Sequence, residues 1–340
     1  MAAGRQRARS TWTRSSTQHR FELTPVSAGN WTDHEPNPLP RIGRMRVVRT
    51  LAELAAALER ARTDRRTVGL VPTMGAFHEG HLSLIRLARA RCETVVVSLF
   101  VNPSQFDEHA DLECYPRDER RDVELAAAAG ADLLFAPSVA DMYPPGFATA
   151  VEVIGLTDRL EGAARGAAHF RGVATVVTKL LCMTAPQVAF FGQKDAQQLA
   201  VIRRLVADLN LPVAIESAPT VREPDGLAAS SRNVLLSGEE RSRALALPAG
   251  LRAAHELAQT GVRSGAELLL RAREAMVERG VEPEYLELVD PDSFESRERL
   301  TRAALLVVAA RVGSVRLIDN IELQPAAVAA PSQTPREVLA

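Results

Sequence analysis

From residue 45 onward, apolar residues follow two alternating spacings. Short unbroken apolar runs are typical of buried parallel strands, and apolar residues at every third or fourth position are typical of amphipathic helices. The strand-like runs cover residues 68–72, 94–101, 133–136, 188–191 and 213–217, and the helix-like segments cover 51–63, 80–91, 120–129, 173–184 and 195–209. This alternation predicts an α/β fold with a Rossmann-like, doubly wound parallel sheet.

The pattern changes beyond about residue 220. Two helices rich in Ala, Leu and Arg are expected at 238–260 and 265–279, followed by strand runs at 285–289, 305–311 and 315–318. A group of helices followed by a group of strands is typical of an α+β unit. We therefore predict a Rossmann-like domain at 45–220 and a smaller C-terminal α+β domain at 221–323.

Both ends of the chain differ from this pattern. Residues 1–44 are rich in Arg, Ser and Thr and contain no acidic residue before Glu22, so we predict a disordered N-terminal extension. The same composition also resembles an organelle transit peptide, and a true start at Met45 is a further alternative. Residues 324–340, rich in Ala, Pro and Ser, are predicted to form a flexible tail.

Composition narrows the possible functions. The 340 residues are 46% apolar and 24% charged, which is typical of a globular protein, and the net charge of -1 disfavours binding to nucleic acid or an anionic membrane. No apolar run reaches the roughly 18 residues of a membrane span. Cys92, Cys114 and Cys182 lack the spacing of a zinc site or a disulfide framework. We expect a cytoplasmic protein with small-molecule partners.

The most informative motif, PTMGAFHEGH at residues 72–81, follows the first strand of the predicted sheet. His78 and His81 lie where the next helix begins, and free N–H groups at a helix N-terminus attract anions. Gly75 and Gly80 would let a ligand approach the backbone closely. The turn therefore predicts binding of a nucleotide phosphate. A zinc site lacks a third ligand nearby, and two capping histidines are the plain structural alternative.

A second strand-to-helix turn, FFGQKDAQQ at residues 190–198, contains Lys194. Basic residues in this chain are almost all arginine, and the lysines are Lys179 and Lys194. A lysine at the end of a strand can neutralise phosphate charge, and Asp195 can cap the helix or bind a ribose hydroxyl. The motif is weak by itself and gains weight beside the histidine turn.

A third segment, DGLAASSRN at residues 225–233, lies at the predicted boundary between the domains. Ser230 and Ser231, followed by Arg232, can give a triphosphate hydroxyl hydrogen bonds and a charged fork. An interdomain turn that starts with Asp225 and Gly226 is the structural alternative.

Neutral amides indicate a pocket for an organic acid. Asn102 and Gln105 lie in FVNPSQF at residues 100–106, and Gln198 lies one helical turn after Lys194. Amides orient hydroxyl and carboxylate groups without adding charge, and His169 can contribute as well. For each residue alone, an ordinary satisfied side chain is the alternative.

Six segments in this order resemble the pantothenate synthetase family: PTMGAFHEGH, FVNPSQF, YPR from Tyr115, HFRGV, FFGQKDAQQL and VREPDGLAASSRN. The resemblance extends over about residues 45–323. It implies an AMP-forming ligase that joins pantoate to beta-alanine, with cleavage of ATP to AMP and pyrophosphate through a pantoyl-adenylate. It also implies use of Mg²⁺, a cytoplasmic homodimer, and a C-terminal domain that closes over ATP.

The resemblance also implies roles for single residues. The residues that match the family's ATP site are Met74, Gly75, Ala76, Phe77, His78, Glu79, Gly80, His81, Gly192, Gln193, Lys194, Asp195, Val221, Ala229, Ser230, Ser231 and Arg232. The residues expected to stabilise charge during catalysis are His78, His81, Lys194, Ser230, Ser231 and Arg232, with His81 at the position of the family's proton donor. Gln193 departs from the family's usual Glu, and Ala229 from its Met or Ser.

On the acid side, Gln105 and Gln198 match positions that hold pantoate, and Gln105 also faces beta-alanine. Asn102, Tyr115 and His169 are further candidates for substrate binding, and Asp122 is a candidate Mg²⁺ ligand.

Other classes with a similar histidine turn are nucleotidylyltransferases and class I aminoacyl-tRNA synthetases. The former would release no free AMP, and the latter should carry a basic tRNA-binding domain, which this chain of near-zero net charge does not indicate. A non-catalytic adenylate-binding protein is the third alternative.

Overall fold

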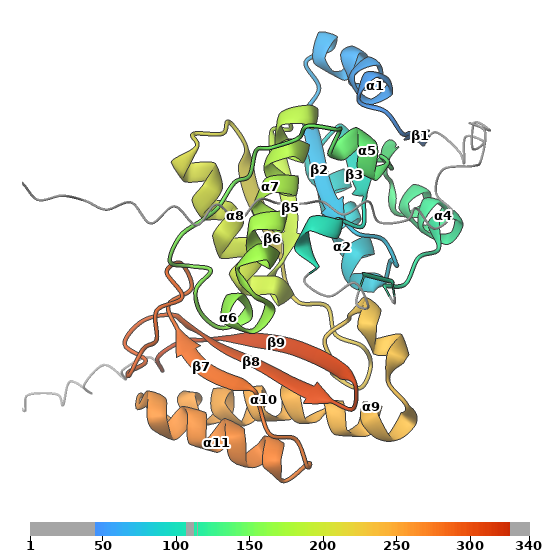
Figure 1. Cartoon of the computed structure of the whole chain (residues 1–340). Coiled ribbons are helices and arrows are strands. Elements are labelled where there is room, and N and C mark those ends of the chain that lie inside the picture. Colours follow the sequence, from blue (N-terminus) through green and yellow to red (C-terminus); the bar gives the residue numbers. More distant parts are fainter. Residues whose placement is uncertain (1–44, 107–111, 114, 327–340) are drawn as a thin grey trace, which may run out of the picture. The chain divides into compact units, whose positions relative to one another are not determined.

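The computed structural model describes residues 45–106, 112–113 and 115–326, and its main feature is a sheet of six parallel strands (Figure 1). The strand order is β1-β4-β3-β2-β5-β6. These strands are β1 (Arg46–Val48), β2 (Val68–Thr73), β3 (Thr94–Leu99), β4 (Leu133–Phe135), β5 (Val188–Gly192) and β6 (Ala214–Ala218). The predicted doubly wound α/β sheet is confirmed. The predicted extension at 1–44 and the part of the predicted tail beyond residue 326 lie outside the described residues.

Helices connect these strands and set the position of the site. They are α1 (Leu51–Thr63), α2 (Glu79–Arg91), α4 (Glu119–Ala129), α5 (Val139–Met142), α6 (Glu161–Arg165), α7 (Ala167–Thr184) and α8 (Ala196–Asp208). The chain places β3 and β4 on one side of β2, and β5 and β6 on the other. The connections therefore change direction between β2 and β5, and ligands bind at such a switch point in open α/β sheets.

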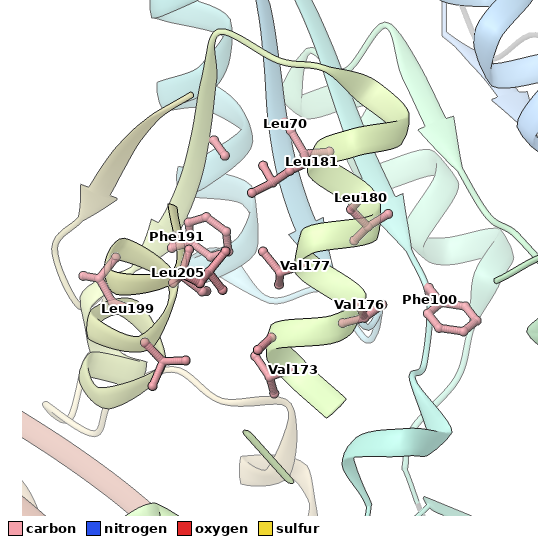
Figure 2. Close-up of a cluster of buried hydrophobic side chains, with 14 of the residues drawn as sticks. Leu70, Phe100, Val173, Val176, Val177, Leu180, Leu181, Phe191, Leu199 and Leu205 are labelled. Carbon is pink, nitrogen blue, oxygen red and sulfur yellow. The ribbon is translucent and has the colours of Figure 1, made fainter. Parts of the chain in front are cut away.

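Alternation along the strands separates two apolar clusters. Val96 of β3 belongs to the cluster with α1, α7 and α8, whereas Val95 and Val97 belong to the cluster with α2 and α4. Figure 2 shows the first cluster, in which Val177 and Leu181 of α7 lie over the sheet. Burying each such side chain stabilises the fold by about 1.5–3 kcal/mol. The helices are thus held on both faces of the sheet.

A second sheet follows, with three antiparallel strands in the order β7-β8-β9. The strands are β7 (Tyr285–Val289), β8 (Ala304–Val312) and β9 (Val315–Leu323), and the helices before them are α9 (Gly238–Ala244), α10 (Ala246–Gln259) and α11 (Gly265–Val277). Figure 1 shows α10 and α11 along one face of this sheet, where they share a buried apolar cluster with its strands. The predicted α+β unit is confirmed, and its exact boundary near residue 220 stays a prediction.

Three differences from the sequence expectations have local causes. The helix predicted at 238–260 breaks at Leu245, because Pro248 has no N–H and its ring would clash with the carbonyl of Ala244 in a continuous helix. Strand β9 runs on to Leu323, because it pairs with β8 as far as Ala304, although polar residues interrupt its apolar pattern. The short elements β1, α5 and α6 were not predicted.

Two smaller findings bear on the sequence expectations. Over residues 45–106, 112–113 and 115–326, no helix combines the length and the apolar character needed to cross a membrane. Cys92 is buried and Cys182 is exposed, and neither is in a disulfide, while Cys114 lies outside the described residues.

Candidate functional site

A pocket lies at the carboxyl ends of β2 and β5, where the switch point predicts a ligand site. Segments after β6 and in β9 complete it. The predicted site residues that line it are Met74, His78, Gly80, His81, Asn102, Gln105, Tyr115, His169, Gly192, Lys194, Asp195, Gln198, Val221, Ala229, Ser230, Ser231 and Arg232. The predicted residues that do not line it are Gly75, Ala76, Phe77, Glu79, Gln193 and Asp122. The fold thus brings most of the candidates into one cavity.

The turn after β2 is fixed from behind by Asp122 of α4. Its buried carboxylate accepts the N–H groups of Ala76 at 2.8 Å and Phe77 at 2.7 Å. Gly75 has a φ of +87°, and a Cβ there would lie 2.8 Å from Asp122 Oδ2, so glycine is required. Burial raises the pKa of Asp122, although the two N–H groups favour its charged form. Each oxygen therefore accepts one backbone N–H, and the predicted Mg²⁺ role of this residue stays a prediction.

Glu79 and Gln193 are exposed beside the cavity. Glu79 forms an exposed ion pair with Arg86, so its side chain contacts the surface of α2 and not the pocket. The departure at Gln193 therefore falls on a side chain that does not line the pocket.

The two histidines cap the N-terminus of α2 with their own rings. Nδ1 of His78 accepts the N–H of Gly80 at 3.1 Å, and Nδ1 of His81 accepts the N–H of His78 at 3.4 Å. A ring whose Nδ1 accepts must carry its proton on Nε2 when neutral. Burial, aided by the nearby Lys194 ammonium, lowers the pKa of His78 to about 4. Burial, aided by His78 and Lys194, lowers the pKa of His81 to about 3. At neutral pH, both rings therefore offer neutral Nε2–H donors.

These buried rings predict a loss of stability in acid. Burial also lowers the pKa of His169 to about 4, whereas an ordinary histidine titrates near 6.5. Between about pH 4 and 6.5 the unfolded chain therefore binds more protons, so stability rises with pH across this window. We expect the free energy of unfolding to fall by about 1–2 kcal/mol per ring from pH 7 to pH 5. Urea unfolding at several pH values, repeated on His81→Gln, checks this, and an equal pH slope in both proteins would contradict it.

Lys194 lies in the short helix η2 (Gln193–Asp195) after β5. The backbone of this turn is held by Asn320 of β9, whose Nδ2 donates to the carbonyls of Gln193 and Lys194. Asp195 stands at the N-cap of α8 but makes no side-chain capping bond, so the capping alternative is wrong for this residue. Its predicted ribose contact stays a prediction.

The third segment is tied to the first. The hydroxyl of Ser231 donates to the carbonyl of Ala76 at 3.0 Å, and Ser230 Oγ accepts the N–H of Arg232 at 3.3 Å at the start of η3 (Ser231–Leu235). The guanidinium carbon of Arg232 lies 6.0 Å from the ring centre of Tyr115. Hydroxyl and guanidinium groups therefore stand beside the histidine turn.

Neutral groups gather at the β3 side of the pocket. Asn102 Nδ2 donates to Gln105 Oε1 and to the carbonyl of Gly172, both at 3.1 Å, which orients the Gln105 amide. His169 Nδ1 lies 2.8 Å from the Gln105 carbonyl. Tyr143, which the sequence analysis missed, donates its hydroxyl to Asn102 Oδ1 at 2.8 Å. No motif surrounds Tyr143, so only the fold reveals it.

A buried charge cluster beside the pocket was also missed. The carboxylate of Glu161 meets Arg165 at 2.9 Å, Arg316 at 2.8 Å and the hydroxyl of Tyr285 at 2.8 Å. Burial alone would raise the pKa of Glu161, but Arg316 and Arg165 lower it. Glu161, Arg165 and Tyr285 line the pocket, so part of its wall is charged. Tyr285 and Arg316 are far from Glu161 in the sequence, so only the local Glu161–Arg165 pair could be read from spacing.

Known proteins are similar to this chain in sequence and fold. A family model described as pantoate-beta-alanine ligase matches residues 46–322. A pantothenate synthetase of Cereibacter sphaeroides is 54% identical over 276 residues, 81% of this chain and 98% of that protein. The crystal structure of pantothenate synthetase from Thermus thermophilus is 49% identical, with a TM-score of 0.78 over 83% of this chain and 100% of that chain.

A third relative is described with ligands. The crystal structure of pantoate-beta-alanine ligase from Francisella tularensis, complexed with beta-gamma ATP and beta-alanine, is 32% identical. Its TM-score is 0.69 over 82% of this chain and 97% of that chain. The family model, over residues 46–322, includes every segment that lines the pocket. On this identity and coverage, the chain belongs to the pantoate-beta-alanine ligase family.

Proposed function

We propose that this pocket condenses pantoate with beta-alanine, using ATP and releasing AMP and pyrophosphate. The observation that carries the proposal is the meeting of Lys194, the two histidines and the Ser231–Arg232 pair at the switch point, next to the Asn102 and Gln105 amides. Cationic and N–H groups suit the phosphates, and oriented amides suit a hydroxy acid. The family matches do not favour the nucleotidylyltransferase alternative.

In the first step, a carboxylate oxygen of pantoate attacks the α-phosphorus of ATP, and the bond to pyrophosphate breaks. Negative charge grows on the phosphate oxygens, and the Lys194 ammonium, the Arg232 guanidinium and the histidine Nε2–H groups can stabilise it. Because both histidines are neutral, they act as hydrogen-bond donors at neutral pH. No protein nucleophile takes part.

In the second step, the amine of beta-alanine attacks the acyl carbon of pantoyl-adenylate. The acyl–phosphate bond breaks, AMP leaves with the electron pair of that bond, and water takes the proton that the nitrogen loses as the amide forms. Gln105 and Gln198, both on the pocket wall, would hold pantoate through both steps. These neutral groups would contribute mainly by holding the reactants in the orientation that the reaction needs.

The decisive experiment measures pyrophosphate and AMP release, with pantoate and beta-alanine added singly and together. Pyrophosphate release that needs pantoate, and pantothenate with free AMP only when both are present, would support the proposal. Pantoate-independent nucleotide transfer without free AMP would favour a nucleotidylyltransferase. ATP binding without any release would favour a non-catalytic relative.

We further propose that Mg²⁺ enters the site with the phosphates of ATP. Within the described ranges, no three His, Cys, Asp or Glu residues are placed to hold a metal, and Asp122 already accepts two N–H groups. Mg²⁺ commonly keeps its waters and binds substrate phosphates with few protein ligands. Mg²⁺ held in this way would neutralise part of the phosphate charge.

This proposal predicts how Asp122→Asn will behave. The variant should lose activity by about tenfold, because an amide can accept only one of the two N–H groups and the turn shifts. The Mg²⁺ concentration for half-maximal activity should stay the same. Titration of Mg²⁺ at fixed ATP measures this, and a much higher Mg²⁺ requirement in the variant would restore Asp122 as a ligand.

From the family resemblance, we also propose that the protein is a cytoplasmic homodimer. Light scattering tests the homodimer, since a mass of 36.8 kDa in solution would contradict a dimer. Fractionation of cells that express the chain from its own gene tests the cytoplasmic location.

A further inference from the structure

Two adjacent residues of β9 reach two different sides of the pocket. Asn320 is 7% exposed, and its Nδ2 lies 3.0 Å from the Gln193 carbonyl and 2.9 Å from the Lys194 carbonyl. Asp319 is 3% exposed and accepts the two terminal nitrogens of Arg222 at 2.7 and 3.1 Å. Neighbours on a strand point to opposite faces, so one short stretch of β9 can hold two separate segments.

Another side-chain hydrogen bond of the turn that carries Lys194 is long, at 3.5 Å from Gln193 Nε2 to Ser217 Oγ. Asp195, at the N-cap of α8, makes no side-chain capping bond. A lysine side chain is a flexible stem, so the reach of its ammonium depends on where the backbone lies. Asn320 bonds two consecutive carbonyls of this backbone, including that of Lys194 itself.

The neighbouring contact stabilises a second segment that lines the pocket. Arg222 pairs with Ala228 across a short bridge, and the N–H of Ala229 donates to the Val221 carbonyl at 2.9 Å. This hairpin leads directly into Ser230. By anchoring Arg222, Asp319 ties the hairpin to the same strand that holds the Lys194 turn.

We infer that Asn320 is a positioning residue for adenylate formation, and that it acts through Lys194. Its amide fixes the Gln193–Lys194 backbone so that the Lys194 ammonium faces the phosphates of the nucleotide. The inference rests on the proposed function of the pocket. A residue of the C-terminal three-stranded sheet would thus position Lys194, which follows β5 of the six-stranded sheet.

The test is a cycle of Asn320→Ala, Lys194→Ala and the double variant, measured by pantoate-dependent pyrophosphate release. Asn320→Ala alone should lower turnover by about 10- to 100-fold, because small displacements of a catalytic group are costly. In the Lys194→Ala background, the same change should have almost no further effect. Losses that multiply, or normal turnover in Asn320→Ala, would overturn the inference.

ATP affinity measured by calorimetry gives a readout that does not need turnover. Asn320→Ala and Lys194→Ala should each weaken ATP binding, and the double variant should bind no more weakly than Lys194→Ala. If the wild type released no pyrophosphate, the proposed function would fail, while this binding cycle would still decide the role of Asn320. Equal ATP affinity in Asn320→Ala and the wild type would contradict it.

Two further variants separate positioning from general stability. Asn320→Asp keeps the shape of the side chain but removes both donated bonds, so it should reproduce the loss if the alanine variant does not fold. Gln187→Ala removes a hydrogen bond of 2.7 Å that the side-chain oxygen of Gln187 accepts from the N–H of Val68. This contact lies at the amino ends of the strands. It should lower the melting temperature while leaving turnover normal, and an equal loss of turnover there would indicate a merely structural effect.

Discussion

Lys194→Ala is expected to lower the rate of pantoate-dependent pyrophosphate release by about two to three orders of magnitude, the range for loss of one preorganised charge-stabilising group. The residue stands at the end of β5, beside the switch point, and lines the pocket. Its charge is close enough to lower the pKa values of His78 and His81. Removing it takes away the ammonium that can face the phosphates as pyrophosphate leaves. Rapid-quench measurement of pyrophosphate under single-turnover conditions gives the rate directly.

The chain supplies a matched control for this variant. Lys179, its other lysine, lies in α7 with its ammonium 4.8 Å from the ring centre of Phe147, and it does not line the pocket. Lys179→Ala should keep near-normal turnover and lose only the cation–π contact, worth about 0.5–1 kcal/mol. Near-normal pyrophosphate release from Lys194→Ala would refute the electrostatic role.

Gly172→Ala is expected to remove most of the activity through crowding. A Cβ on this residue of α7 would lie 2.3 Å from the Ser104 carbonyl oxygen and 2.7 Å from the Gln105 nitrogen. The short helix η1 (Pro103–Gln105) must then move, and the amide of Gln105 moves with it. We expect about a 100-fold loss in turnover and a cost of about 1–3 kcal/mol in the free energy of unfolding.

Substrate dependence distinguishes this effect from general damage. ATP affinity, measured by calorimetry, should stay within a few-fold of the wild type, because the Lys194 turn lies after β5 and η1 follows β3. Gly238→Ala at the start of α9 is the control, since no atom lies within 4 Å of a Cβ there. Parallel losses of ATP affinity and turnover in Gly172→Ala would point to collapse of the whole pocket.

The parts of the fold that were predictable from sequence depend on local signals. Helix α1 begins after Thr50 and ends at Thr63, and its apolar spacing and capping box can both be read from neighbouring residues. The turn at 72–81 and the segment at 190–198 were placed at strand ends for the same reason. Their resemblance to one family then indicated that they bind ATP, before any contact was visible.

Apolar spacing did not predict the structure where polar side chains form hydrogen bonds with segments far away in the sequence. Asp319 and Asn320 interrupt an apolar run, so the last strand was predicted to end at Ile318. These residues bond Arg222 and the Gln193–Lys194 backbone, in two other segments of the chain. Asp122 is a candidate Mg²⁺ ligand only through the family resemblance, and that role stays a prediction. In the structure, its oxygens accept two backbone N–H groups.

The sequence by itself determined the α/β order of the elements, the strand-end turns and the family. Apolar spacing, helix caps and glycine positions act within a few residues, so they can be read without the fold. Only the tertiary structure decided which carbonyls Asn320 holds, which N–H groups Asp122 accepts, and why His78 and His81 are neutral. Burial and hydrogen bonding between segments far apart in the chain arise only when the sheets form, and no local pattern encodes those partners.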